Sequence, residues 1–489
     1  MSGTLSPDGP DVTPAASTPS MFPGYHQDRG DERLEQPTLT PAPRWPLSKR
    51  LLFRFSFIYF VLYFLPFPID AFMRLRMVPG LSWLADAAGI ISGTWENGQQ
   101  KYGLWDQGTH AMCLWVGRNI LHLPDTGPGS IVIQSTGSGD TMLKYVEALC
   151  FGVIAAAGAL LWSIFDRKRQ AYPRLFAAWH VYLRFALGAV LLGYGFAKFP
   201  PQQFQPPSPE KLVSTYGNSS MMGLLWTFMG ASAAYTMFAG LAEIIGGALL
   251  LFRRTALLGA LVSIGVMLNV FMLNMCYDVP VKLYSLHLLV TSIIIALPFA
   301  SRLVCVALLN RPTTPCVLWR PSCSTWQKWS LRGVRICAIV LILGMGLFSS
   351  YYSWQRYLNP PPTSPLAGLY KVQSLELGGK PARELSDAQR WRRVSVTRWG
   401  TIVVDNHTDQ REYIRFKHDE TAKTLTLTPQ GPSGEGYVLN CTSAEDGSVT
   451  LEGEYQTGAL KLSLTKVDTD KLPLRARGFS WIQEKPVNW

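Results

Sequence analysis

The chain has 489 residues, of which 48% are hydrophobic, 12% aromatic and only 16% charged. This composition excludes a single soluble domain of ordinary size and indicates a polytopic membrane protein. The formal net charge of +12 does not indicate a nucleic-acid partner, because the basic residues cluster beside apolar segments. Such clusters are the topology signal of cytoplasmic loops. They include Lys49, Arg50, Arg167, Lys168, Arg169, Arg253, Arg254, Arg302 and Arg332.

The eight cysteines form no CxxC pair and show no cysteine and histidine spacing of a metal site. We therefore expect no zinc or iron–sulfur centre, no thioredoxin-like redox pair and no metal ligands. The polar C-terminal region contains only Cys441, so it cannot form a disulfide within itself.

The N-terminal residues 1–45 are polar and rich in Pro, Ser, Thr and Asp, which predicts a disordered cytoplasmic arm without a secretory signal peptide. The first membrane span is predicted at 51–69. It follows Lys49 and Arg50 directly, and this order places the N-terminus inside.

The region 46–175 is predicted to contain the first two spans, the second at 142–165, with an outer cap between them. No stretch of the cap reaches the length that a bilayer requires. Its amphipathic segment 105–123 interleaves Trp, Leu and Ile with charged residues, so we expect it to lie in the interface plane. Asp140 or Thr141 is expected to cap the helix that follows.

Residues 176–300 are predicted to form a module of four membrane helices. The segment 221–230 is apolar but too short to cross a bilayer, and we expect it to enter the membrane as a half-helix. The four spans are expected at about 176–199, 240–254, 258–282 and 283–298.

A cytoplasmic basic loop and a seventh span at 334–352 are predicted within 301–355. Residues 366–489 then alternate apolar and polar side chains between Gly, Asp, Asn and Pro, which predicts an antiparallel β barrel or sandwich. The fold class is therefore an all-α polytopic membrane bundle of about seven transmembrane helices with a C-terminal extracytoplasmic all-β domain. Whether that domain is filled or hollow stays open.

Charged side chains inside the predicted spans mark the candidate site, because an ionisable group in a bilayer is costly unless it is paired or faces a polar cavity. Arg184 and Lys198 share one helix face with glycines between them. Glu243 lies in a patch of small residues that lets helices approach closely. The depths of Arg184 and Glu243 predict that these two residues form an ion pair.

We expect a polar pocket that opens to the outer face and is floored by this ion pair. Glu243 and His287 are the candidate catalytic residues, with a role in proton handling. The residues expected to line the pocket or to bind a ligand are Arg184, Lys198, Asn269, Asn274, Asp278 and Lys282.

Structural roles are the alternatives for these same residues. Arg184 and Glu243 could lock two helices together, and Lys198 could extend to the interface. Asp278 and Lys282 could cap the turn between two spans. His287 could be a packed histidine whose hydrogen bonds are satisfied.

The membrane core contains the segments RFALGAVLLGYGFAKF, AEIIGGALLLFRRTALLGAL and MLNVFMLNMCYDVPVKLYSLHLL. In these segments it resembles the DoxX-like membrane proteins, the group around the DoxD subunit of thiosulfate oxidation. The resemblance covers about residues 176–300 and implies a four-helix membrane module that works with redox or sulfur metabolism near the quinone pool. Its polar positions correspond to Arg184, Lys198, Glu243 and Asn274.

The first hypothesis for function is a quinone- or redox-linked membrane subunit, with quinone as the candidate cofactor and the lipid bilayer and a redox protein as partners. The alternatives are a small-molecule transporter or carrier and an envelope assembly or scaffold protein that acts through its outer β domain. The expected location is a bacterial inner (plasma) membrane. The sequence leaves the substrate, enzymatic activity and oligomeric state open.

Overall fold

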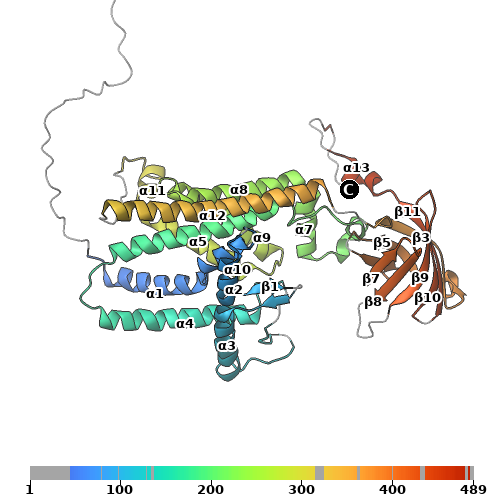
Figure 1. The fold of residues 1–489 in the computed structure, drawn as a ribbon, viewed down its shortest axis with the longest axis horizontal. Coiled ribbons are helices and arrows are strands. Elements are labelled where there is room, and N and C mark those ends of the chain that lie inside the picture. Colours follow the sequence, from blue (N-terminus) through green and yellow to red (C-terminus); the bar gives the residue numbers. More distant parts are fainter. Residues whose placement is uncertain are drawn as a thin grey trace, which may run out of the picture.

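The computed structural model shows a helical bundle and a β barrel arranged along one long axis (Figure 1). It describes residues 44–478 and 483–484, except for 79, 97–98, 128, 134–136, 314–323, 361–363, 399, 430–435 and 457. The expected N-terminal arm therefore lies outside the described residues, apart from positions 44 and 45.

Seven helical segments in the described part of the chain are long and apolar enough to cross a bilayer, which confirms the predicted bundle of about seven apolar helices. The sixth span continues from α10 through a short 3₁₀ turn (Leu297–Phe299) into α11 (Ala300–Ala307). The spans are built on α1 (Leu47–Phe64), α4 (Met142–Phe165), α5 (Pro173–Lys198), α8 (Ala233–Leu251), α9 (Ala256–Cys276), α10 (Lys282–Ala296) and α12 (Thr325–Leu358).

Helices α5 and α8 form the close contact at the centre of the bundle. A Cβ atom added to Gly195 would lie 2.8 Å from the carbonyl oxygen of Gly240, and one added to Gly247 would lie 2.9 Å from that of Gly188. These glycines therefore allow the two backbones to touch, as the small-residue patch predicts. They also fix the register, with Gly188 beside Gly247 and Gly195 beside Gly240.

The predicted cap lies across the ends of the spans that face the barrel, which we call the barrel side. Helix α3 is formed by most of the predicted amphipathic segment, and it runs roughly perpendicular to α4 (Figure 1). The cap consists of a 3₁₀ helix (Ile69–Met77), α2 (Ser82–Ser92), the hairpin β1 (Thr94–Glu96) and β2 (Gln99–Lys101), and α3 (Leu104–Asn119).

Asp140 caps a helix distant in sequence, so the expectation that Asp140 or Thr141 caps the following helix is wrong. Its carboxylate accepts hydrogen bonds from the backbone N–H groups of Lys282 and Leu283, at 2.8 and 2.9 Å. The Gly139 N–H donates to the carbonyl of Pro280 at 2.8 Å. Residues 138–140 thus close over the first turn of α10, and the Thr141 side chain makes no capping bond.

The segment between α5 and α8 lies at the barrel side and does not enter the bundle as a half-helix. It contains α6 (Pro209–Leu212), a 3₁₀ turn (Tyr216–Asn218) and α7 (Met221–Ala231), and α7 stands between the bundle and the barrel (Figure 1). Leu225 and Met229 of α7 pack with Phe204 and Val279. The apolar face of α7 thus packs against the barrel-side ends of the spans. Entry of α7 into the bilayer stays a prediction.

The C-terminal domain is a closed antiparallel barrel, in which β11 pairs back with β3. A short strand β4 (Lys380–Pro381) extends from the end of β3. The eight barrel strands are β3 (Gly368–Leu377), β5 (Trp391–Val396), β6 (Thr401–Asn406), β7 (Arg411–Asp419), β8 (Thr424–Pro429), β9 (Tyr437–Ser443), β10 (Val449–Tyr455) and β11 (Gly458–Val467).

Apolar side chains fill the interior of this barrel. They come from every strand of the closed sheet, and most are less than 5% exposed. The domain is therefore a solid-cored module rather than a cup. Its central side chains include Leu375, Val394, Val404, Ile414, Leu425, Leu439, Leu451 and Leu462.

Three arginines join the barrel domain to the segment between α5 and α7. Arg393 donates to the carbonyl of Val213 at 2.9 Å, and Arg411 donates to that of Glu210 at 3.2 Å. Arg475, in the short helix α13 (Pro473–Ala476), donates to the carbonyl of Pro207 at 3.1 Å. The barrel is thus held against the bundle independently of its covalent link to α12.

Replacing Leu439 by Ala should destabilise the barrel by about 3 kcal/mol, because this side chain is fully buried and its loss leaves a cavity. Hydrogen exchange of the barrel amides in the full-length protein in detergent measures the effect. Its neighbour Val438 is 59% exposed, so Val438→Ala is the matched control and should leave exchange unchanged. Equal effects of both substitutions would contradict the filled core.

Candidate functional site

Glu243 forms its ion pair with Lys198 and not with Arg184. The Lys198 Nζ atom lies 3.0 and 2.8 Å from the two carboxylate oxygens of Glu243, and both side chains are less than 10% exposed. The ammonium group also lies 5.5 Å from the ring centroid of Tyr194. Close opposite charges inside the bundle offset the cost of removing either one from water.

The glycine contacts between α5 and α8 explain why the predicted Arg184–Glu243 pair is wrong. Gly188 lies beside Gly247, and Arg184 is one turn before Gly188 on α5. Arg184 therefore lies beside the C-terminal end of α8, away from Glu243. There the Arg184 Nε donates to the carbonyl of Leu250 at 2.8 Å. Arg184 is 4% exposed and ties the two helices together on the side opposite the barrel.

His287 is buried between aromatic rings of α1. Its ring stacks on Tyr63 at a centroid distance of 4.0 Å. Nδ1 donates to the carbonyl of Leu283 at 2.7 Å, and Nε2 lies 2.7 Å from the hydroxyl of Tyr59. Because a carbonyl only accepts, the neutral ring carries its proton on Nδ1 and accepts from Tyr59. A catalytic role for His287 stays a prediction.

The remaining predicted residues occupy separate places. The Asn274 amide donates to the Ser285 hydroxyl at 3.0 Å and joins α9 to α10. Asp278 and Lys282 form an ion pair of 2.7 Å across the turn between these helices. Asn269 is exposed on the outer surface of the bundle, so it lines no pocket formed with Arg184 or Glu243.

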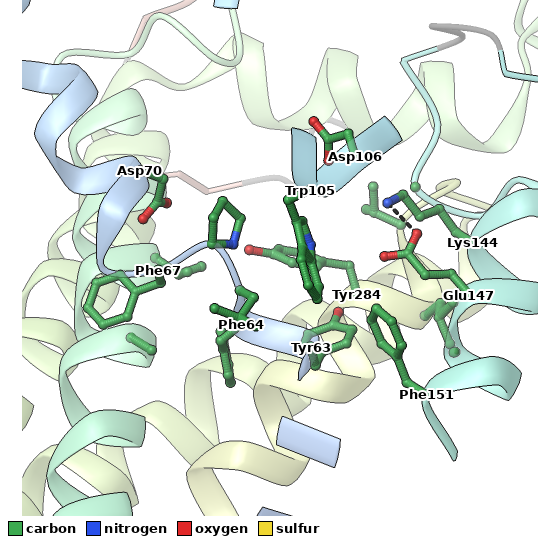
Figure 2. A pocket seen from close by; sticks show the side chains of 18 of the residues that line it. Tyr63, Phe64, Phe67, Asp70, Trp105, Asp106, Lys144, Glu147, Phe151 and Tyr284 are labelled. Carbon is green, nitrogen blue, oxygen red and sulfur yellow. Dashed lines mark hydrogen bonds and ion pairs between the residues drawn. The ribbon is translucent and has the colours of Figure 1, made fainter. Parts of the chain in front are cut away.

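A cavity of about 540 Å³ lies between the cap and the barrel-side ends of the spans. Aromatic side chains form much of its wall, and Figure 2 shows Trp105 of the cap reaching toward Tyr63, Phe151 and Tyr284. The polar or aromatic side chains of its lining are Tyr63, Phe64, Phe67, Asp70, Trp105, Asp106, Ser138, Lys144, Glu147, Phe151, Tyr194 and Tyr284.

The charged groups of the cavity lie mainly on α3 and α4. Lys144 and Glu147 form an ion pair of 2.6 Å on the first turns of α4 (Figure 2). Asp106 lies in the first turn of α3, where burial raises the pKa of its carboxyl group. One helix turn later, burial lowers the pKa of His110, so this histidine is neutral at neutral pH. The cavity therefore combines a partly buried carboxyl group, whose pKa is raised, with an ion pair.

None of the eight predicted site residues lines this cavity, but two of them lie directly behind its wall. Tyr63 separates His287 from the cavity, and Tyr194 lies between the cavity and the Lys198–Glu243 pair. The cavity takes its ion pair from the first turns of the second span, outside the four-helix module. Lys144 and Glu147 are ionisable residues in a predicted span and are the signal that could have located the cavity.

A second buried polar group lies on the opposite side of the bundle. Arg54 is 1% exposed, and its guanidinium donates to the carbonyl of Asp166 and to the hydroxyl of Tyr172, each at 3.2 Å. That hydroxyl donates to the Asp166 carboxylate at 2.9 Å. Arg54 thus ties α1 to the connection between α4 and α5.

Comparison with known proteins finds one relative of part of the chain. It is the uncharacterised protein YwoB of Bacillus subtilis (strain 168), which is 36% identical over 102 residues. The match spans 21% of this chain and 64% of YwoB. No family model matches the chain, and no solved structure matches it. The resemblance to DoxX-like proteins therefore stays a prediction.

Single substitutions of the buried ion pair, Lys198→Met or Glu243→Leu, should each cost about 3–5 kcal/mol, because each leaves an unpaired buried charge. The double variant should be more stable than either single variant, which unfolding of the protein in detergent measures as a double-mutant cycle. The exposed pair Lys461–Glu452 is the control, and its loss should cost less than about 1 kcal/mol. Additive effects at Lys198 and Glu243 would contradict the pair.

Asp106→Asn should stabilise the protein at pH 8 and have little effect near pH 4. The pKa of Asp106 is raised in the fold above its ordinary value of 3.8, so ionisation lowers stability only as the pH rises above that range. Thermal unfolding at several pH values tests this. Asp125→Asn, at an exposed carboxylate of the cap, is the control and should give no such pH-dependent gain.

Proposed function

We propose that the protein is a quinone- or redox-linked membrane subunit that binds the head group of a membrane quinone in the cavity below the cap. The observation that carries this proposal is the combination of aromatic walls, hydroxyl donors and carboxyl groups around one space of about 540 Å³. Pockets for small molecules are typically apolar with a few polar groups that fix orientation.

The aromatic rings suit a planar head group. Trp105, Tyr63 and Tyr284 present ring faces and edges to the cavity (Figure 2), and such rings favour offset stacking on a flat ligand. The smaller side chains of Ala186 and Ala189 from α5 offer apolar surface for the start of an isoprenoid tail.

The polar groups suit the two carbonyl oxygens of a quinone ring. The hydroxyls of Tyr63, Tyr194 and Tyr284 are hydrogen-bond donors, and a bound carbonyl can only accept. Asp106, whose pKa is raised by burial, supplies one carboxyl group beside the ring, and Glu147 supplies a second. A bound quinone would supply two-electron redox chemistry, for which these residues provide binding and proton contacts.

The orientation that accompanies this proposal places the barrel side outside the cytoplasm of a bacterial inner membrane. Basic residues concentrate at the opposite ends of the spans, next to α1, α4, α8 and α12, and short cytoplasmic loops carry such an excess. The cap, the cavity and the barrel would then face the exterior or periplasm.

A carrier of cationic amphiphiles is the second candidate. Three carboxyl groups, from Asp70, Asp106 and Glu147, line the cavity together with a single lysine, Lys144. Aromatic rings beside an excess of acidic groups favour a cation as well as a neutral ring. The two candidates differ in their dependence on Asp106, since an ammonium group requires the ionised carboxylate.

Trp105→Ala should weaken binding of a short-chain quinone analogue by about five- to tenfold, the loss of one stacking contact of about 1 kcal/mol. Binding is measured by calorimetry on the purified protein in nanodiscs. Trp115→Ala removes a 60% exposed tryptophan from the same helix and should leave affinity unchanged.

Mass spectrometry of lipids extracted from the purified protein provides a second readout, and a retained quinone is expected. Absence of binding by both methods would reject the quinone proposal. Binding of an alkyl trimethylammonium compound that is lost in Asp106→Asn would then support the carrier.

A further inference from the structure

Two buried cysteines meet where the cap rests on the second span. Cys113 lies in the middle of α3 and Cys150 in the third turn of α4, and their side chains are in hydrogen-bond contact. Cys113 is 0% and Cys150 6% exposed. The two thiols are not covalently bonded in the structure.

We propose that Cys113 and Cys150 form a disulfide that fastens the cap to the membrane bundle. The oxidant is a disulfide-donating protein on the barrel side. The two thiols lose two electrons and two protons as the S–S bond forms, and the disulfide of the donor is reduced to two thiols. This inference rests on the orientation proposed above, in which the barrel side faces an oxidising compartment.

The surroundings of the pair suit a structural bond. Leu143, Val146 and Ile131 enclose the two sulfur atoms in one apolar cluster. In the described part of the chain no other two free cysteines share a core cluster. A disulfide adds no polar or charged group to such a site, whereas two thiols leave weak donors without strong acceptors.

The timing of the reaction follows from the same burial. Thiol exchange requires a thiolate, and burial raises the pKa of Cys113 to about 12 in the closed structure. The bond must therefore form while α3 is still folding onto α4. Once the apolar cluster closes, it shields the disulfide from soluble reductants.

The position of the pair connects it to the cavity. Asp106 and Cys113 are seven residues apart on α3 and so lie on the same face of that helix. Glu147 and Phe151, which line the cavity, flank Cys150 on α4. A bond between Cys113 and Cys150 therefore fixes the first turn of α3, with Trp105, against the cavity.

The first experiment uses the wild-type protein in membranes of a bacterial host. Free thiols are blocked with N-ethylmaleimide during denaturation, and the protein is digested and analysed by mass spectrometry without reductant. A peptide pair that joins Cys113 to Cys150 and disappears after reduction is expected. Alkylation of both residues in the unreduced sample, or a bond from either one to another cysteine, would overturn the proposal.

The second experiment measures stability with and without a membrane-permeant reductant. Denaturation in reductant followed by refolding should lower the unfolding midpoint of the wild type by about 5 °C or more, because the cross-link no longer restricts the unfolded chain. The Cys113→Ala/Cys150→Ala variant should show no such reductant effect. The control Cys276→Ala changes an exposed cysteine and should keep the wild-type response to reductant. If Cys276→Ala also abolished that response, the result would count against the Cys113–Cys150 pair.

Discussion

The structure depends on the requirement that polar groups inside a bilayer find partners within the protein. The contact between α5 and α8 meets this requirement for three buried charged residues, Arg184, Lys198 and Glu243. Glycines bring the two backbones together, and the same register sets Lys198 against Glu243 and Arg184 against the carbonyl of Leu250. A buried pair of this kind adds little net stability, but it strongly penalises any other register of the two helices.

The cavity follows from how loops are fixed at the barrel side. Asp140 closes over the first turn of α10, and this contact joins the end of the cap to the turn after α9. The cap helix α3 is thereby held across the span ends, and Trp105 reaches the space that the spans leave open. The charged groups of the cavity thus come from segments outside the four-helix module, whereas Tyr194 and Tyr284 of that module add hydroxyl groups.

The spans, the helix of the cap and the β domain could be predicted from the sequence, because hydropathy and periodicity are local properties. The side-chain contacts of the charged residues could not be predicted in the same way. The pairing of Glu243 depends on which glycines touch, and the role of Asp140 depends on a contact with Lys282 and Leu283 across 142 residues. Hydropathy marks His287 as a polar residue within a span, but its two hydrogen-bond partners are the carbonyl of Leu283 in its own helix and the hydroxyl of Tyr59, which lies far away in sequence.

The closed sheet of the C-terminal domain determines how another protein could engage it. In the described strands, β11 pairs with β3, and only the two-residue β4 leaves a short edge. A strand from a partner therefore finds no long row of free backbone N–H and C=O groups to continue. A partner protein must therefore contact the side chains and turns of this domain. The same closure protects the domain from self-association through its sheet.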